Sequence, residues 1–225
     1  MTKRLDREYP VDISAPIHDA FGVRLRRVHE YRTLGDIHRT LVAAFEGQRG
    51  GKCAVAMAFF RLRRALGRRR GLTPSLELET LAPRKASSLL KMLARQTGLT
   101  MPETHGDAVQ NTGAILLIVS TLAGIGLLTS GPAIYLWIVL ALFALGGAIA
   151  SLGGTRFYEG TRTLGRLAGR VAAINFGMLV KQGACAGPDQ LWAALVEIAG
   201  MYTDIPRDQL RPETPLATFR RDAGY

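Results

Sequence analysis

The sequence predicts an all-α protein made of two interleaved helical bundles and a two-helix transmembrane hairpin. Three observations lead to this fold class. No charged residue occurs between Asp107 and Arg156. In the arms on either side of this stretch, apolar residues recur at the spacing of one helix face. Short segments of the first arm also recur in the second. We therefore expect one apolar hairpin between two amphipathic helical arms.

The charge-free stretch divides into two apolar runs, 114–129 and 133–152, which are separated by Ser130-Gly131-Pro132. A bilayer core of about 30 Å needs roughly 20 apolar helical residues, with about 17 as the lower limit. The first run only just qualifies and the second does so easily, so we expect a transmembrane helical hairpin over 113–153. The alternative is a hairpin buried in a protein core. Such helices normally carry a polar stripe, whereas the only polar side chains of these runs and their turn are hydroxyls.

The charges on the flanks predict the topology of this hairpin. Segment 1–112 contains 20 Lys and Arg against 11 Asp and Glu, whereas segment 155–225 contains 9 against 7. Positively charged flanks stay on the cytoplasmic side of a membrane. The turn at 130–132 is too short to hold a folded domain, so both arms must share one compartment. We expect an inner (plasma) membrane protein with two passes and both termini cytoplasmic. In a reducing compartment, Cys53 and Cys185 are not expected to form a structural disulfide.

Small residues at four-residue spacing predict how the two membrane helices pack. Such spacing lets helices in lipid approach each other closely. The pairs in the two runs are Ser120 with Gly124, Gly146 with Ala150, and Gly147 with Ser151. They favour packing within one chain, and homodimerisation is the alternative. Neither run carries an ionisable residue of the kind that marks a transport pathway, so a channel or transporter is not expected.

Both arms contain an amphipathic helix followed by a similar loop. In the first arm, Val55, Phe59, Leu62 and Leu66 fall on one helix face. In the second arm, Leu191, Leu195, Ile198 and Tyr202 have the same spacing. The loops that follow are LTPSLEL at 72–78 and LRPETPL at 210–216, in which Leu, Pro and Leu recur at the same offsets.

Two further pairs of segments repeat. The sequence Arg-Thr-Leu-Gly occurs at 32–35 and again at 162–165, and an apolar stripe follows each copy. Thr33 and Thr163 are expected to cap these helices, because a Thr hydroxyl can accept one of the free backbone N–H groups. The pattern Ile13, Ile17, 22–25 likewise recurs at an offset of 76, at Leu89, Leu93 and 98–101. The chain therefore contains two copies of one helical module, each assembled from separated pieces.

The repeated module resembles the four-helix acyl carrier protein family. The resemblance is carried by Phe21-Gly22-Val23-Arg24-Leu25 and by Thr33-Leu34-Gly35-Asp36-Ile37, which follows it. It implies two interleaved carrier-protein-like bundles. Module A would consist of 1–50 with 186–225, and module B of 51–107 with 156–185, with the hairpin inserted in module B.

The resemblance also shows what this chain lacks. Carrier proteins attach phosphopantetheine to a Ser at the start of the second helix. By the family's usual spacing, the serine-equivalent positions here are Arg7 and Pro83. Ser87 and Ser88 lie about one turn too far along and have no preceding Asp. We therefore expect no phosphopantetheine and no other cofactor.

Basic residues replace the acidic surface that is typical of the carrier family. The helix matching the family's recognition helix carries Arg84, Lys85, Lys91 and Arg95. A second basic cluster lies near the end of the 53–70 helix: Arg61, Arg63, Arg64, Arg68, Arg69 and Arg70. These arginines could complement the helix dipole or contact anionic lipid headgroups. Nucleic acid is the third alternative and is not favoured, because aromatic residues for base stacking are not interleaved with the charges.

No enzymatic motif stands out. The four histidines form no H-E-x-x-H pattern, and no Cys–His pair has metal-ligand spacing. Gly50-Gly51-Lys52 is not a P-loop, since Glu46 and Cys53 occupy the positions of its first glycine and its final hydroxyl residue. We expect no metal site, and catalysis on a small molecule is the least favoured function.

The predicted function is that of a membrane-anchored, non-catalytic carrier-like scaffold or adaptor. Its expected partners are membrane lipids and another protein, possibly a lipid- or polyketide-handling enzyme, because such enzymes recognise the carrier shape. The alternative is peripheral binding or organisation of anionic lipids through the arginine-rich helix. No nucleic-acid partner is expected.

Overall fold

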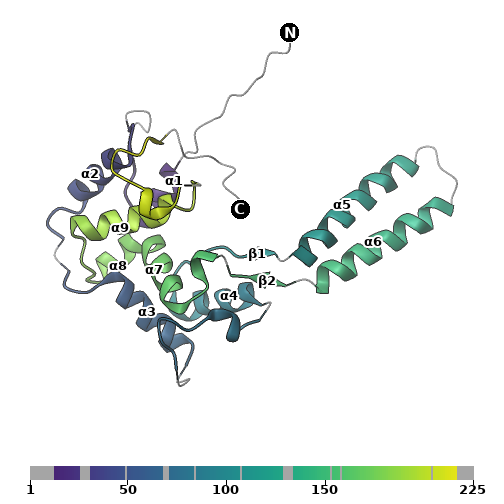
Figure 1. Cartoon of the computed structure of the whole chain (residues 1–225), viewed down its shortest axis with the longest axis horizontal. Helices are drawn as coiled ribbons and strands as arrows, with labels where there is room; N and C mark the ends of the chain where they lie inside the picture. The colour runs from purple at the N-terminus through teal and green to yellow at the C-terminus, as the bar shows by residue number, and fades with distance from the viewer. Residues whose placement is uncertain are drawn as a thin grey trace, which may run out of the picture. The chain divides into compact units, whose positions relative to one another are not determined.

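The computed structural model is mostly helical and has almost no strand (Figure 1), which confirms the predicted all-α class. It describes residues 13–25, 31–48, 50–67, 71–83, 85–106, 108–128, 134–152, 154–157, 159–203 and 205–216. The described chain divides into two compact units. Unit 1 comprises 1–76, 93–102 and 163–225, and unit 2 comprises 77–92 and 103–162.

Unit 1 contains most of the amphipathic helices. Those lying wholly within it are α1 (Ser14–Phe21), α2 (Leu34–Ala44), α3 (Ala54–Ala65), α7 (Leu164–Ile174), α8 (Phe176–Lys181) and α9 (Pro188–Ala199). A short 3-10 turn, η4, covers Arg207–Gln209. The boundary between the units passes through α4 (Ala86–Thr97).

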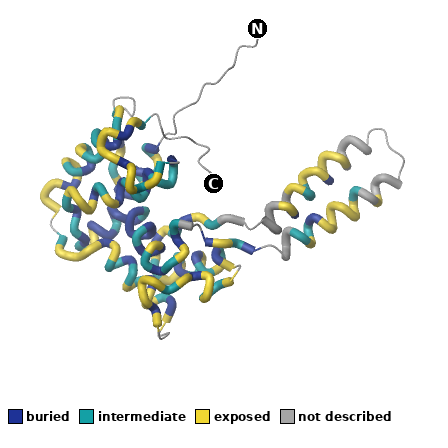
Figure 2. Tube along the Cα trace, viewed as in Figure 1, coloured by how far each residue is buried: buried dark blue, intermediate teal, exposed yellow. Residues whose placement is uncertain are grey.

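Helix α7 lies at the centre of unit 1. It packs against α1, α3 and α9, and Leu164, Leu167 and Val171 along it are completely buried. Three aromatic rings pack against one another, with centroids 5.5 Å apart for Phe21 and Phe176 and 6.1 Å apart for Phe45 and Phe176. The buried residues gather where these helices meet (Figure 2). The core of unit 1 is thus built from helices that are distant in sequence.

Asn175 joins the end of α7 to the segment that follows α4. Its side-chain amide donates to the Thr100 and Val171 carbonyls, and its side-chain oxygen accepts from the Thr100 N–H, each at 2.8 Å. Both the oxygen and the nitrogen of the Asn175 side chain are thereby hydrogen-bonded, so its buried amide is tolerated here.

Unit 2 contains a helical hairpin and a small sheet. The hairpin consists of α5 (Ala108–Leu128) and α6 (Ile134–Leu152). Strand β1 (His105–Gly106) precedes it, strand β2 (Thr155–Arg156) follows it, and the two strands pair antiparallel. Two 3-10 turns complete the unit, η2 (Leu78–Thr80) and η3 (Glu159–Thr161). Two-residue strands carry too little alternation to be recognised in the sequence, which is why this sheet was not predicted.

The transmembrane prediction is wrong. Crossing a bilayer takes about 20 consecutive apolar helical residues, and no helix in the described part of the chain is long and apolar enough to do so. The expected transmembrane hairpin over 113–153 and the expected two-pass location in the inner (plasma) membrane are therefore corrected.

Candidate interaction site

Two loop–helix junctions repeat the same backbone hydrogen bonds. In the first, Gly35 N–H donates to the Pro212 carbonyl at 2.8 Å and Leu34 N–H to the Thr214 carbonyl at 3.0 Å. In the second, Gly165 N–H donates to the Pro74 carbonyl at 2.8 Å and Leu164 N–H to the Leu76 carbonyl at 2.9 Å. The repeated Arg-Thr-Leu-Gly segments therefore have the same partners in the repeated loops.

The two glycines of these junctions are equivalent in their surroundings. A Cβ on Gly35 would lie 2.9 Å from the Pro212 carbonyl oxygen, and a Cβ on Gly165 would lie 2.9 Å from that of Pro74. Side chains do not normally approach a backbone oxygen so closely. Glycine is thus required at both positions by the approach of the loop.

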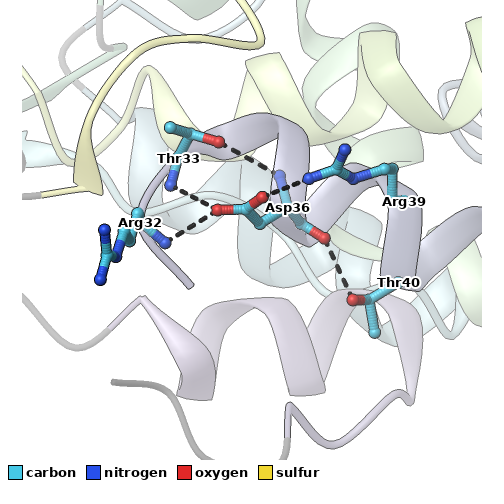
Figure 3. A network of polar contacts seen from close by, with 5 residues as sticks. All are labelled: Arg32, Thr33, Asp36, Arg39 and Thr40. Carbon is cyan, nitrogen blue, oxygen red and sulfur yellow. Dashed lines mark hydrogen bonds and ion pairs between the residues drawn. The ribbon is translucent and has the colours of Figure 1, made fainter. Parts of the chain in front are cut away.

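The first junction includes the capping network of α2 (Figure 3). Asp36 N–H donates to the Thr33 hydroxyl at 3.3 Å, and the Asp36 carboxylate accepts from the N–H groups of Arg32 and Thr33 at 2.9 and 3.0 Å. Arg39 donates to the other carboxylate oxygen. This is a complete capping box, and the predicted Thr33 cap is confirmed.

These donors stabilise the ionised form of Asp36. The backbone N–H groups of Arg32 and Thr33, followed by the Arg39 guanidinium, lower the pKa of Asp36 to about 2. The equivalent cap on α7 is simpler, because Arg166 stands where α2 has Asp36. There Thr163 accepts from Arg166 N–H at 3.3 Å, which confirms the second predicted cap.

An open groove of about 750 Å³ lies between the second half of α2 and the segment that leads into α9. Val42, Ala43, Ala186 and Pro188 supply apolar lining. His38 is held at one edge, where its Nε2 lies 2.9 Å from the Pro188 carbonyl oxygen and its ring meets that of Trp192 edge-on at 5.4 Å. The groove was not predicted, since it exists only because α2 and α9 are neighbours.

A second, basic hollow of about 480 Å³ is lined by Arg61, Arg64, Ala65, Gln96 and Thr97. Arg61 donates to the Gln182 side-chain oxygen. Arg63 on the same helix is exposed. The remaining arginines predicted to contact headgroups, at 68–70, lie outside the described residues.

Glu197 on α9 lies between two arginines. Its carboxylate accepts from Arg207 at 2.6 Å and lies 4.0 Å from Nε of Arg170, whose side chain is only 3% exposed. Burial raises the pKa of Glu197 above its usual value of 4.5, although Arg207, Arg170 and Arg166 act in the opposite direction. No sequence pattern pointed to this cluster.

The serine-equivalent positions hold no attachment residue in the described chain. Pro83 is exposed in the turn before α4, and Arg7 lies outside the described residues. Ser87 is in the first turn of α4, where its hydroxyl accepts from the Thr155 hydroxyl at 3.0 Å. Ser88 is exposed. The basic side chains Lys85, Lys91 and Arg95 are also exposed, and Arg84 is outside the described part.

The predicted hairpin-packing residues differ in their surroundings. Ser120 is buried and donates to the Leu117 carbonyl of its own helix. Gly146 faces α5 closely, since a Cβ there would lie 3.1 Å from the Leu117 nitrogen, whereas Gly147 has open space. The side chains at 124, 150 and 151 are not among those described.

Comparison with known proteins gives no relative: no family model, no curated protein and no solved structure matches this chain. Within the described residues, no group of three or more His, Cys, Asp or Glu side chains is placed to hold a metal ion.

Proposed function

We propose that this chain is a non-catalytic, carrier-like scaffold that binds another protein and carries no prosthetic group. The observation that carries this proposal is the pair of equivalent junctions, in which Gly35 and Gly165 receive their loops through the same hydrogen bonds. A duplicated module of the carrier type accounts for this equivalence. A membrane anchor is no part of this function.

Packing within unit 1 supports the assembly of each module from distant segments. Helix α9 packs on α1 and α2, as expected for module A, and α3 packs on α7, as expected for module B. Helix α7 also packs on α1 and α9, so the two proposed modules share one core. Residue 216 also donates to the Arg32 carbonyl at 2.9 Å, which extends the contact between the two ends of module A. We infer that 186–225 completes the bundle begun by 1–50.

The surroundings of the α4 serines support the absence of a carrier arm. A phosphopantetheine arm needs an accessible Ser at the start of the helix, whereas Pro83 precedes this helix and the Ser87 hydroxyl is hydrogen-bonded to Thr155. Only Ser88 is exposed, and no Asp precedes it. The module would then keep the shape that acyl-handling enzymes recognise without the group that they act on.

The partner that fits best is a protein with an acidic surface and an apolar contact for the groove. Arg95 is exposed on the part of α4 that lies in unit 1 and would repel the basic surfaces that ordinary carrier proteins meet. Val42 and Ala43 offer an apolar contact at the groove. A lipid- or polyketide-handling enzyme with an acidic docking face would meet both conditions.

The test is affinity capture of the purified chain's partner in low and high salt. A defined acyl-handling protein should remain bound in high salt and should be lost with Val42→Asp in the groove. Val55→Asp is the matched control, since Val55 is 44% exposed on α3 and does not line the groove. Equal capture by both variants would remove the groove from the interface. Salt-sensitive liposome binding without any captured protein would favour the next candidate.

The second candidate is recognition of anionic lipid headgroups by the basic hollow. Arg61 and Arg64 line it together with the neutral hydrogen-bonding side chains Gln96 and Thr97, a combination suited to a phosphate group. Binding to vesicles that contain anionic lipid should then be salt-sensitive and should weaken strongly in the Arg61→Gln/Arg64→Gln variant. Unchanged binding by this variant would exclude the hollow.

A further inference from the structure

The segment that contains Cys53 pairs with the segment that contains Cys185. Lys52 N–H donates to the Gly183 carbonyl at 3.3 Å, and Cys185 N–H donates to the Lys52 carbonyl at 2.7 Å. Lys52 and Ala184 thereby form a parallel bridge. Gly50 also lies against the Ala184 backbone, where a side chain would collide with the carbonyl group. The two segments therefore run side by side in unit 1.

The register of this bridge places the two cysteines opposite each other. Cys53 and Cys185 each follow a bridge partner, and the backbone at Cys53 is still extended, with φ −70° and ψ 125°. Residues opposite each other in paired strands face the same side, and the strands lie about 4.8 Å apart. Disulfides join residues whose Cα atoms are about 4.4–6.8 Å apart. The pairing thus supplies the spacing that a disulfide needs.

We propose that Cys53 and Cys185 are a redox pair that forms a reversible intramolecular disulfide with a low-molecular-weight disulfide as oxidant. Both residues are free thiols in the structure. They are the only cysteines of the chain, so they can pair within the molecule only with each other. This proposal does not depend on the proposed function. It concerns a reversible bond and not the structural disulfide that the sequence argues against.

The two thiols differ in exposure, so we expect them to react one after the other. Cys53 is exposed and Cys185 is half-buried. The Cys53 thiolate attacks the small disulfide, forms a mixed disulfide and releases one thiol. The Cys185 thiolate then attacks the Cys53 sulfur and releases the second thiol. The two protein thiols lose two protons and two electrons, and the small disulfide is reduced to two thiols.

The bond would fasten the start of α3 to the segment that enters α9. Cys53 is the residue before α3, and Cys185 lies two residues before Gly187, which precedes α9. A link between residues so far apart in sequence removes much of the freedom of the unfolded chain. The oxidised protein should therefore unfold at a higher temperature than the reduced protein.

The experiment treats the full-length reduced protein with oxidised glutathione under native conditions. Both thiols should disappear without a retained glutathione adduct, and non-reducing peptide mapping should recover one peptide that joins Cys53 to Cys185. The thermal midpoint should rise and should return to its original value after reduction. In denaturant the same treatment should give less of the joined peptide, because the register no longer holds the thiols together.

Single variants test the order of the two steps. Cys185→Ser should accumulate glutathione on Cys53, since no second thiol can resolve it. Cys53→Ser should react more slowly, because its remaining thiol is half-buried. If the native protein keeps both thiols, carries two glutathione adducts, or forms only disulfides between molecules, the proposal is overturned.

Discussion

Gly35 donates its backbone N–H to the Pro212 carbonyl oxygen at 2.8 Å, although 176 residues separate them in the sequence. Gly165 makes the same bond with Pro74 at the same distance. In both junctions the proline carbonyl oxygen would lie only 2.9 Å from a Cβ added to the glycine. The two glycines therefore offer matched positions at which the proposed duplication can be tested.

Replacing either glycine by alanine should destabilise the protein to a similar extent. Each new Cβ would meet a backbone oxygen at 2.9 Å, so the loop must move away. Overpacking of this kind costs about 1–3 kcal/mol. The free energy of unfolding of Gly35→Ala and Gly165→Ala, measured by urea denaturation, should fall by comparable amounts.

Gly169→Ala is the control for these two variants. Gly169 lies within α7, and a Cβ there would meet nothing within 4 Å. Alanine is favoured over glycine in a helix by up to about 1 kcal/mol, so this variant should be as stable as the parent or more stable. If the free energy of unfolding falls in only one of Gly35→Ala and Gly165→Ala, the two junctions are not equivalent.

Asp36 should make stability depend on pH in the acid range. Its pKa is lowered from 3.8 to about 2 in the folded chain, so its contribution is complete above pH 3.8 and is lost as the pH falls toward 2. Asp36→Asn should lower stability at neutral pH and flatten this part of the profile. Chemical denaturation across the acid range measures both effects.

The variant Arg39→Gln separates the contribution of the Arg39 guanidinium to the lowered pKa of Asp36 from that of the backbone N–H groups. This variant removes the guanidinium that donates to the Asp36 carboxylate, which is the third-largest contribution to the lowered pKa of Asp36. The backbone donors of Arg32 and Thr33 stay in place. The acid-range profile of this variant should lie between those of the parent and Asp36→Asn. A profile as flat as that of Asp36→Asn would mean that the capping N–H groups contribute little.

Glu197 should have the opposite effect on pH dependence. Burial raises its pKa above 4.5, so the folded chain holds this proton to a higher pH than the unfolded chain does. Its contribution is complete below pH 4.5 and is lost as the pH rises through the folded pKa. Glu197→Gln should flatten the decline in stability above pH 4.5. If the stability of this variant declines above pH 4.5 as steeply as that of the parent, another titrating group causes the decline.

The local pattern of the sequence predicted much of unit 1. Leu191, Leu195 and Ile198 are buried along α9, as their helical spacing predicts. At the end of α3, Leu62 and Leu66 of the predicted stripe are buried. In its first half, however, Ala54 and Ala58 are buried while Val55 is exposed. The small side chains of the two alanines let α3 lie close to α7. A prediction that looks only for large apolar side chains does not find such positions.

The remaining features depend on contacts between distant segments. The groove beside Val42 and the ion pairs of Glu197 exist because α9 lies beside α2 and α7. No short motif encodes such an arrangement. The transmembrane prediction failed for a related reason, since it counted apolar residues alone. In the structure, some of that surface serves contact between α5 and α6, as at Gly146 and Leu117.

We propose that a carrier-like module functions in this protein without a phosphopantetheine arm. The most direct measurement is the intact mass of the protein after incubation with coenzyme A and a broad-specificity phosphopantetheinyl transferase, with a functional carrier protein as the positive control. We predict that the control gains the phosphopantetheine mass while this protein stays unmodified, because Pro83 precedes α4 and the Ser87 hydroxyl is bonded to Thr155. A phosphopantetheine adduct mapped to Ser87 or Ser88 would contradict the claim and identify the chain as an active carrier.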